Sequence, residues 1–383
     1  MVENAELISL NSSKSMLIRQ LILSFLYGEK LEGICANDSE DVKLVHHLLS
    51  IINQGFTDNG TVNLDVMDCG AAYRFLMAVA AVTPGRWHLT GTPRLLTRPI
   101  LPLVVALQQI GADITSSASG WDITGRPLHA KHVSVDCTKS SQLGSALLLI
   151  QQRIGAEEVT ILPAAPPSAP YIELTRRMAD AYRKGVTVPR EGDWSTAAFW
   201  YAYLLARKDL TSLTLSNLHL NSWQGDRVVA EWFRNFGVQS EQQNGDVWIH
   251  KADIGGNTAP LTFDLTAHPD LAPVLAATAL LCGRRATLHG LASLNSKESR
   301  RLDLLSEVMG HFTKVEVSGN DTLEIFINQE DSESETLHFD AHNDHRIVMF
   351  LTLLSTRFNL HISGCHSVKK SYPDFEKYFP TRA

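Results

Sequence analysis

The sequence predicts an α/β protein that folds as two globular domains. Helical periodicity, with apolar residues three and four positions apart, recurs about twelve times along the chain, and short β-rich stretches lie between the helical segments. The expected helix starts fall into pairs whose members are roughly 26 to 30 residues apart, which indicates six copies of one α/β unit. At 383 residues, the chain is also too long for one ordinary hydrophobic core.

The expected elements follow this repeat in order along the chain. The paired helix starts lie near Lys14 and Glu40, Gly70 and Arg98, Ser140 and Pro170, Asp193 and Trp223, Pro269 and Lys297, and His345 and Pro373. Strands are expected at 133–135, 159–162 and 323–327, and turns at 119–120, 244–245 and 318–320. Three units per domain place the boundary near Glu191-Gly192-Asp193, because no low-complexity linker marks one.

Composition and charge exclude several classes of protein. The formal charge of -7, from 34 basic and 41 acidic residues, disfavours nucleic acid as a partner, so any basic site must be a local pocket. The longest apolar run, near 271–282, is too short to cross a bilayer, and the first six residues show no secretion signal. Five scattered cysteines without a Cys-x-x-Cys pair indicate reduced thiols, so we expect a cytoplasmic protein that binds neither membrane nor structural zinc.

The first candidate site is the helix start at Asn11-Ser12-Ser13-Lys14-Ser15. Free N–H groups and the positive end of the helix dipole attract an anion there, and the hydroxyls and Lys14 add donors and a positive charge. A serine N-cap followed by a solvated lysine is the alternative interpretation. We expect a phosphate site, because similar helix starts recur along the whole chain.

Helix starts in the second and third units also carry donors for anions. Gly70 and its small neighbours let a ligand approach the backbone, and Arg74, Arg94 and Arg98 offer forked donors that suit phosphate and carboxylate. The next starts add Ser140, Ser141, Gln142, Ser168 and Tyr171. One arginine alone is more often a surface charge, but three at successive helix starts favour a binding site.

Acidic residues join the cations in the second half of the chain. The helix starts there contain Asp270, Lys297, Glu298, Arg301, Asp344, His345, Arg346 and Lys370. Asp270 precedes an apolar helix, so its carboxylate either complements the helix dipole or takes part in chemistry. Lys297 and Glu298 are adjacent and point in different directions, which favours separate roles.

Metal binding and nucleophilic catalysis are the other functions that these residues suggest. His342 and His345 could be metal ligands, but no third ligand lies at helical or zinc-finger spacing, so we expect no metal. Ser15, Ser140 and Ser141 lack a Gly-x-Ser-x-Gly elbow and a paired base. We therefore expect these serines to donate hydrogen bonds to phosphate.

Taken in order, the motifs closely resemble those of the 5-enolpyruvylshikimate-3-phosphate (EPSP) synthases, a family of enolpyruvyl transferases. The resemblance covers nearly the whole chain: Ser13-Lys14-Ser15 with Arg19, Gly70 with Arg74, Arg98-Pro99, Ser140-Ser141-Gln142, Ser168 with Tyr171, Gly192-Asp193, Pro269-Asp270, Lys297-Glu298 with Arg301, Asp344-His345-Arg346, and Lys370 before Tyr372-Pro373-Asp374. It implies two globes, each of three βαβαββ-like repeats, in the inside-out α/β barrel of this family. One globe would comprise residues 1–13 and 193–383 and the other 14–192, with the active site in the cleft between them.

The resemblance also implies the reaction and its residues. The enolpyruvyl group of phosphoenolpyruvate would pass to the 5-hydroxyl of shikimate 3-phosphate, with release of phosphate, in aromatic amino-acid biosynthesis. Shikimate 3-phosphate would contact Ser15, Arg19, Ser140, Ser141, Gln142, Ser168, Tyr171, Asp270 and Lys297. Phosphoenolpyruvate would contact Lys14, Gly70, Arg98, Gln142, Arg301, Arg346 and Lys370. We expect a monomer that acts on these small molecules without a cofactor.

Proton transfer is assigned to the two carboxylates of the second half. We expect Asp270 to take the proton of the acceptor hydroxyl and Glu298 to move a proton at the methylene carbon. Lys14 and Lys370 are the competing proton donors. Both carboxylates lie at helix starts beside cations, where a carboxylate tends to stay ionised, and substrate phosphates nearby could raise its pKa enough to supply an acid.

The chain departs from the family pattern at three places. The family usually shows Asn-Ala-Gly-Thr where this chain has Asp68-Cys69-Gly70-Ala71, which removes an amide and a hydroxyl and adds a negative charge. Asn11-Ser12 replaces the usual Pro-Gly before Ser-Lys-Ser, and Arg300 replaces the Asp that commonly precedes the last arginine of Lys-Glu-Thr-Asp-Arg. A negative charge near a phosphate site disfavours binding unless a cation compensates for it.

Two alternative functions remain. The sister enzyme that acts on UDP-N-acetylglucosamine shares the fold and the donor, but it carries a cysteine in a glycine-rich loop before its Arg-Pro, and residues 91–98 contain none. A non-catalytic phosphoester-binding protein would be consistent with Asp68 and Ala71. Asp270 and Glu298 favour an enzyme, because a protein that only binds anions has little use for additional carboxylates.

Overall fold

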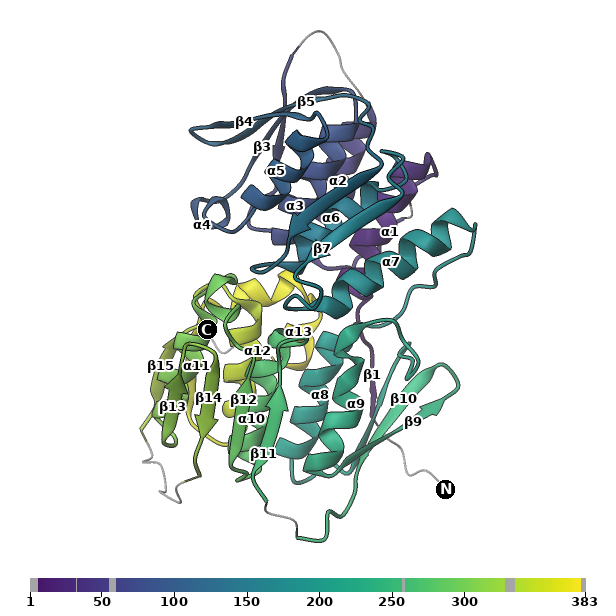
Figure 1. The fold of residues 1–383 in the computed structure, drawn as a ribbon. Helices are drawn as coiled ribbons and strands as arrows, with labels where there is room; N and C mark the ends of the chain where they lie inside the picture. Colours follow the sequence, from purple (N-terminus) through teal and green to yellow (C-terminus); the bar gives the residue numbers. More distant parts are fainter. Residues whose placement is uncertain (1–5, 32, 55–59, 257–258, 328–334, 380–383) are drawn as a thin grey trace. The chain divides into compact units, whose positions relative to one another are not determined.

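The computed structural model describes residues 6–31, 33–54, 60–256, 259–327 and 335–379 (Figure 1). The chain divides into a discontinuous unit, Met1–Ser13 with Arg190–Ala383, and an inserted unit, Lys14–Pro189. Residues 190–192, which we expected in the inserted unit, group with the discontinuous one. The reason is local pairing: the Ser13 N–H donates to the Glu191 carbonyl at 2.8 Å, and Ser12 and Gly192 form an antiparallel bridge. Residues 1–5, on which the expectation of no secretion signal largely rests, lie outside the described residues.

Three helices form the interior of the inserted unit in its described part. They are α1 (Lys14–Tyr27), α3 (Gly70–Val82) and α6 (Ser141–Ile150), and each contacts the other two. Their sequences are apolar on almost every side, and α3 buries every residue from Ala72 to Val82. A helix that is apolar all round is stable only inside a core, so the sequence dictates this central place. Further helices are α2 (Glu40–Gln54), α4 (Pro93–Leu96), α5 (Leu101–Gln109) and α7 (Ala169–Arg183).

The sheets of the inserted unit lie outside its central helices (Figure 1). One sheet has the order β2-β3-β5-β4, with strands β2 (Val62–Asp65), β3 (Gly85–Thr90), β4 (Asp113–Ser117) and β5 (Gly120–Gly125). In it β2 and β3 are parallel, and the β4–β5 hairpin joins β3 through an antiparallel β5. The other sheet, within the described residues, is the parallel pair β6 (His132–Asp136) and β7 (Glu158–Leu162).

The discontinuous unit repeats this plan. Its central helices, among the described residues, are α8 (Trp194–Ala206), α10 (Ala272–Leu281) and α12 (His345–Leu354), which contact one another and lie in one continuous hydrophobic core. The remaining helical elements are η1 (Gly225–Val228), α9 (Val229–Trp232), η2 (Phe233–Phe236), η3 (Pro269–Leu271), η4 (Leu294–Ser296), α11 (Arg301–Gly310), η5 (Cys365–Lys370) and α13 (Phe375–Tyr378). Among the described residues of both units, no helix is long and apolar enough to span a bilayer.

Three sheets accompany these helices in the described part of the discontinuous unit. The first has the order β1-β8-β10-β9, with β1 (Glu6–Ile8), β8 (Ser212–Leu215), β9 (Val238–Gln243) and β10 (Asp246–Lys251). The second has the order β11-β12-β14-β13, with β11 (Leu261–Asp264), β12 (Ala286–His289), β13 (Val315–Ser318) and β14 (Thr322–Ile325). The third is the parallel pair β15 (Leu337–Asp340) and β16 (Leu360–Ser363).

The repeat predicted from the sequence is present, but it is not complete everywhere. Within the described residues, the sheets that begin with β1, β2 and β11 carry the full βαβαββ pattern, and those of β6 and β15 stop after βαβα. The segment of α1 and α2 contains no described strand. The predicted turn at Asn244-Gly245 joins β9 to β10, with both residues at positive φ as a two-residue hairpin turn requires. The predicted α/β class is confirmed, as are the strands at β6, β7 and β14.

The central helices of each unit begin near one another, and this arrangement positions the site. Arg74, in the first turns of α3, donates from Nη1 to Oε1 of Gln142 at the start of α6, at 2.9 Å. Arg346, at the start of α12, lies 3.7 Å from the carboxylate of Asp270, which directly precedes α10. Positive helix ends therefore gather within each unit, where they favour anions.

Candidate functional site

The helix start that opens the inserted unit carries Lys14 and Ser15. Lys14 is the first residue of α1, and its Nζ lies 3.1 Å from Oδ2 of Asp41, in the first turn of α2. Both side chains are partly exposed, at 20% and 14%. The ammonium group is thus held at the positive end of a helix by a neighbouring carboxylate, and it still reaches solvent.

Arg19 lies one turn further along α1 and is a buried cation surrounded by neutral groups. It donates to Oγ1 of Thr175 at 2.7 Å, to the Ser15 carbonyl at 2.8 Å, and to Oγ of Ser145 and the Tyr171 carbonyl at 3.3 Å. Burial lowers the pKa of Arg19 to about 10, and Tyr171 opposes that shift. Among the described residues, none of its hydrogen-bond acceptors is a carboxylate, so a bound anion would supply the missing negative charge.

The start of α3 brings together Gly70, Arg74 and Arg98. A Cβ atom at Gly70 would lie 2.7 Å from Nη1 of Arg98 and 3.0 Å from Nη1 of Arg74, so glycine leaves room for both guanidinium groups. Arg74 donates to the carbonyls of Gly70 and Pro99, each at 3.0 Å, as well as to Gln142. The Nε of Arg98 is buried without a hydrogen-bond acceptor in the described part of the chain. Arg74 thus orients Gln142, and the two guanidinium groups beside Gly70 offer forked donors of the kind that suit phosphate or carboxylate.

Hydroxyl groups stand at the starts of α6 and α7. Ser140 is the N-cap of α6 and Ser141 is its first residue, which is buried. Ser168 is the N-cap of α7 in a left-handed conformation (φ 59°), and its carbonyl accepts from the Tyr171 N–H at 3.1 Å. Neither Ser140 nor Ser168 uses its hydroxyl to cap its helix, so both hydroxyls can serve a ligand.

In the discontinuous unit, Arg301 is buried among three carboxylates. Its Nε and Nη2 each donate to Asp344 at 3.0 Å, its Nη1 donates to Asp270 at 2.8 Å, and its Nη2 also donates to Glu298 at 2.6 Å. Arg301 and Asp344 are 1% and 0% exposed. A guanidinium has five N–H groups, so these bonds occupy most of its capacity, and Arg301 chiefly holds the carboxylates in place.

Asp270 is the centre of this cluster. Its Oδ1 also lies 3.2 Å from Nζ of Lys297, and its backbone carbonyl accepts from Nη1 of Arg346 at 3.1 Å. Burial alone would raise the pKa of Asp270, but Lys297, Arg346 and Arg301 outweigh it and hold that pKa well below the ordinary value. The carboxylate is therefore ionised at neutral pH.

Lys297 and Glu298 lie in a loop, and Lys370 is the last residue of the short helix η5. We expected a helix to start near Lys297, but α11 begins only at Arg301, and Lys297 and Glu298 bridge η4 and α11. This keeps them apart as expected: Lys297 reaches Asp270, and Glu298 reaches Arg301. Lys370, at the end of η5, donates to the Asn343 carbonyl at 3.1 Å.

The departure at Asp68-Cys69-Gly70-Ala71 has a structural counterpart. Cys69 is the N-cap of α3, and its Sγ accepts a hydrogen bond from the Ala72 N–H at 3.4 Å. The thiol here takes the capping role that a hydroxyl, carboxylate or amide side chain usually has. Burial raises the pKa of the Cys69 thiol, so the group is neutral. The helix start therefore keeps a cap without a charge at position 69.

His342 and His345, which we considered as metal ligands, do not belong to a group of side chains that could hold a metal ion among the described residues. His342 has a left-handed backbone (φ 49°), and its N–H donates to Asp340. His345 is buried as the first residue of α12. Over the described ranges, no group of three His, Cys, Asp or Glu side chains is placed to hold a metal ion.

Sequence reasoning missed several partners of the expected residues. Ser145 and Thr175 hold Arg19, and each lies one helical turn after an expected site residue, so i+4 spacing could have found them. Asp41 pairs with Lys14 from the next helix start. Asp344 stood within a recognised motif, but nothing in the sequence showed that it would be the main partner of Arg301.

The buried Arg301–Asp344 pair predicts how stability depends on pH. Burial alone would raise the pKa of Asp344, but Arg301 reverses the effect and lowers it. A carboxylate with a lowered folded-state pKa stabilises the protein above its ordinary pKa, and this contribution is lost as the pH falls through the folded-state value. We expect the free energy of unfolding, measured by urea denaturation, to fall below about pH 4. Asp344→Asn should be less stable at pH 7 and lose less on acidification; an equally steep loss would contradict this assignment.

Comparison with known proteins extends over nearly the whole chain. The sequence profile of the EPSP synthase (3-phosphoshikimate 1-carboxyvinyltransferase) family matches residues 5–379. A 3-phosphoshikimate 1-carboxyvinyltransferase of Dehalococcoides mccartyi is 28% identical over 97% of this chain and 94% of that protein. One of Nitrosomonas eutropha is 30% identical over 81% of this chain and 78% of that protein. The solved EPSP synthase of Acinetobacter baumannii matches with a TM-score of 0.66 at 20% identity, over 97% of this chain and 95% of that one.

Proposed function

The chain belongs to the EPSP synthase family of shikimate-pathway transferases, and we propose that it moves the enolpyruvyl group of phosphoenolpyruvate onto the 5-hydroxyl of shikimate 3-phosphate, releasing phosphate. The observation that carries the proposal is the family match over residues 5–379. The two side-chain clusters support it, because two anionic substrates require cations, neutral donors and ionised carboxylates. The acceptor, a phosphorylated polyol, suits the hydroxyl-rich cluster of the inserted unit.

In this proposal, shikimate 3-phosphate binds the neutral hydrogen-bond donors and the buried cation of the inserted unit. Its phosphate would bind Ser140, Ser141, Ser168 and Arg19, where a buried positive charge has only neutral acceptors. The other contacts in the proposal are Ser15, Gln142, Tyr171, Asp270 and Lys297. Asp270 would hold the hydroxyl that reacts.

Phosphoenolpyruvate would bind the other cationic side chains of the proposed site. Arg98 and Gly70 would meet it at the start of α3, with Gln142 oriented by Arg74. Lys14, Arg346 and Lys370 would complete its contacts. Arg301 contributes at most a minor direct contact in the present arrangement, because Asp344, Asp270 and Glu298 already accept from it.

The reaction needs a proton at the methylene carbon of phosphoenolpyruvate and the removal of one from the acceptor hydroxyl. The hydroxyl oxygen attacks the adjacent carbon, a tetrahedral intermediate forms, and loss of phosphate with a methyl proton restores the double bond. Asp270 would take the hydroxyl proton, and Glu298 would move the proton at the methylene carbon, with Lys14 or Lys370 as the competing donor. All atoms come from the two substrates, so this scheme requires no cofactor.

Substrate binding would adjust Asp270 for this role. In the free protein, Lys297, Arg346 and Arg301 hold the pKa of Asp270 well below the ordinary value, which makes the carboxylate a weak base. A phosphate or carboxylate that binds the same cations adds negative charge beside Asp270 and raises its pKa. The base would thus become stronger when both substrates are present, closer to the value that suits general base catalysis near neutral pH.

The setting proposed for this enzyme is the reducing cytoplasm, where it would act as a monomer. The five cysteines support the first part, because each is a free thiol. Two of them, Cys69 and Cys137, are buried.

Ligand-induced stabilisation tests the choice of acceptor. Shikimate 3-phosphate at about 100 times its dissociation constant should stabilise the fold by about 2.7 kcal/mol through mass action. A titration followed by thermal unfolding should show this rise. UDP-N-acetylglucosamine, the acceptor of the sister enzyme, should leave the unfolding temperature unchanged, and the opposite ranking would reassign the protein to that sister function.

A further inference from the structure

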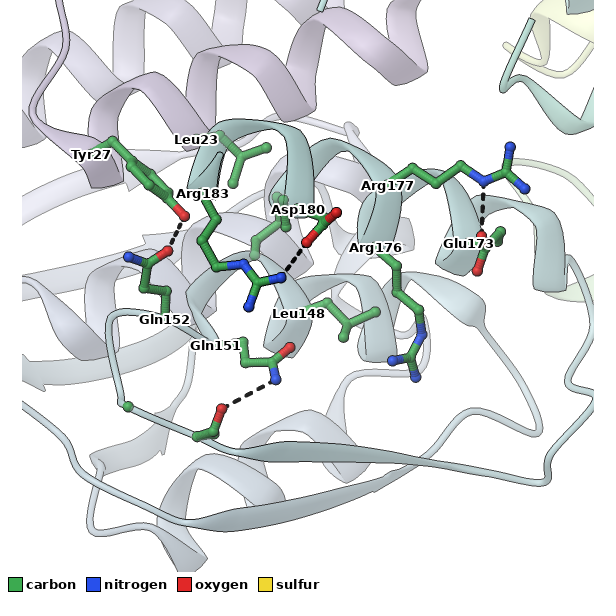
Figure 2. Close-up of a pocket in the computed structure, with 14 residues that line it drawn as sticks. Leu23, Tyr27, Leu148, Gln151, Gln152, Glu173, Arg176, Arg177, Asp180 and Arg183 are labelled. Atoms are coloured by element: carbon green, nitrogen blue, oxygen red, sulfur yellow. Dashed lines mark hydrogen bonds and ion pairs between the residues drawn. The ribbon is translucent and has the colours of Figure 1, made fainter. Parts of the chain in front are cut away.

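The inserted unit contains a cavity that none of the residues assigned to the reaction lines. Its volume is about 650 Å³, and it lies between α1, the end of α6, loop 151–156 and α7 (Figure 2). Leu23, Leu148 and Leu149 form its floor, and Tyr27 closes one end through a hydrogen bond to Gln152. Ligand sites commonly have volumes of roughly 300 to 1,000 Å³, so this cavity is large enough for a small organic molecule.

The cavity lies where the repeat lacks its hairpin. In the complete repeats, the first helix packs against the fourth strand and the second helix against the third: α3 with β5 and α5 with β4, α8 with β10 and α9 with β9, α10 with β14 and α11 with β13. The repeat β6-α6-β7-α7 has no such strands among the described residues, because α7 is followed directly by the end of the unit. The faces of α6 and α7 that would be covered therefore stay open.

Three arginines line this cavity, and they differ in their partners among the described residues. Arg177 donates to Glu173 at 2.8 Å, and Arg183 and Lys184 both form ion pairs with Asp180. Figure 2 shows that Arg177 turns toward Glu173, whereas Arg176 lies beside Leu148. In the described part of the chain, Arg176 forms neither a hydrogen bond nor an ion pair. Of the three arginines that line the cavity, Arg176 alone has no carboxylate partner among the described residues, and its side chain is exposed at the open side.

We propose that this cavity binds a small organic monocarboxylate with a flat apolar body. One guanidinium matches one carboxylate through two parallel hydrogen bonds, whereas a dianionic phosphate would require a second cation that is not already paired. The apolar body would lie between the leucine floor, the Tyr27 ring and the carbon chains of the α7 arginines. The site is independent of the proposed transferase reaction, because it shares no lining residue with it.

Calorimetric titration of the full chain tests this site with a matched pair of probes, naphthalene-2-carboxylate and the neutral naphthalene-2-carboxamide. The wild-type protein should bind the carboxylate saturably, and the carboxamide about tenfold more weakly. Arg176→Gln should weaken the carboxylate about tenfold and leave the carboxamide unchanged. Arg153→Gln is the matched control, because Arg153 is exposed on loop 151–156 and its side chain does not line the cavity. It should bind both probes as the wild type does.

A second variant separates this cavity from the anion sites of the reaction. Ala179, on α7, lines the cavity, so Ala179→Leu should fill it and abolish binding of both probes, while an unchanged unfolding temperature shows that the fold is intact. If the wild type shows no saturable binding, or prefers neither probe, the proposal is wrong. Carboxylate binding that survives in both Arg176→Gln and Ala179→Leu would place the probe elsewhere and overturn the proposal as well.

Discussion

Replacing Asp270 by asparagine is expected to lower kcat about 10²- to 10⁴-fold, the usual contribution of one positioned acid or base. The substitution keeps the shape of the side chain and an oxygen that accepts from Arg301 and Lys297, which contact Asp270 at 2.8 and 3.2 Å. It removes the negative charge and the basicity. The acceptor hydroxyl therefore loses the group that takes its proton, and phosphate release at saturating substrate concentrations measures the loss.

Asp303→Asn is the matched control for this experiment. Asp303 lies on α11 close to the same cluster in sequence, and its exposed carboxylate accepts from Arg300 and Asn295. Its replacement should leave kcat unchanged. Circular dichroism should show both variants folded, and a kcat near that of the wild type in Asp270→Asn would assign the hydroxyl proton to another group.

Replacing Arg301 by methionine is expected to lower the free energy of unfolding by about 3 to 5 kcal/mol, the cost of leaving buried carboxylates without their cation. The side chain of Arg301 is 1% exposed and contacts Asp344, Asp270 and Glu298. Asp344 is fully buried, so water cannot solvate its carboxylate when the positive charge of Arg301 is removed. Urea denaturation at pH 7 measures the change.

The adjacent arginine supplies the control. Arg300 is 70% exposed and pairs with Asp303 on the surface, so Arg300→Met should cost at most about 1 kcal/mol. Acid should also reduce the difference in unfolding free energy between the wild type and Arg301→Met. Without Arg301 the pKa of Asp344 rises, so Asp344 becomes protonated and neutral as the pH falls. Equal destabilisation by the two substitutions would show that the buried carboxylates do not depend on Arg301.

The repeat could be predicted from the sequence because its helices are long and apolar. Paired helix starts depend only on the helix–strand–helix part of each unit, which every described repeat except that of α1 and α2 contains. The missing hairpins leave this pairing intact, so the pairing itself carries no sign of them. A missing hairpin does shorten the stretch of sequence between one pair of helix starts and the next. The stretch from Arg98 to Ser140, which contains a hairpin, is nearly twice as long as the stretch from Pro170 to Asp193, which does not. That difference is the signal from which the open faces of α6 and α7 could have been expected.

The candidate site was predictable only at the level of residue type and position. Serines, glycines and cations at helix starts follow from helix electrostatics, and the structure places Gly70, Arg98 and Gln142 around one arginine. The partner of each charge depends on packing between elements that are distant in sequence. Arg301 illustrates this, because it looked like a ligand-binding cation, and the fold surrounds it with three carboxylates of its own unit.

Phosphate release from phosphoenolpyruvate, with each acceptor offered in turn, tests the central claim most directly. The wild-type protein should release one phosphate for each shikimate 3-phosphate consumed, and none with UDP-N-acetylglucosamine or without an acceptor. Release with UDP-N-acetylglucosamine would contradict the assignment in favour of the sister enzyme. If shikimate 3-phosphate stabilises the fold and still yields no phosphate, the protein is a phosphoester-binding relative and the proposed transferase activity is wrong.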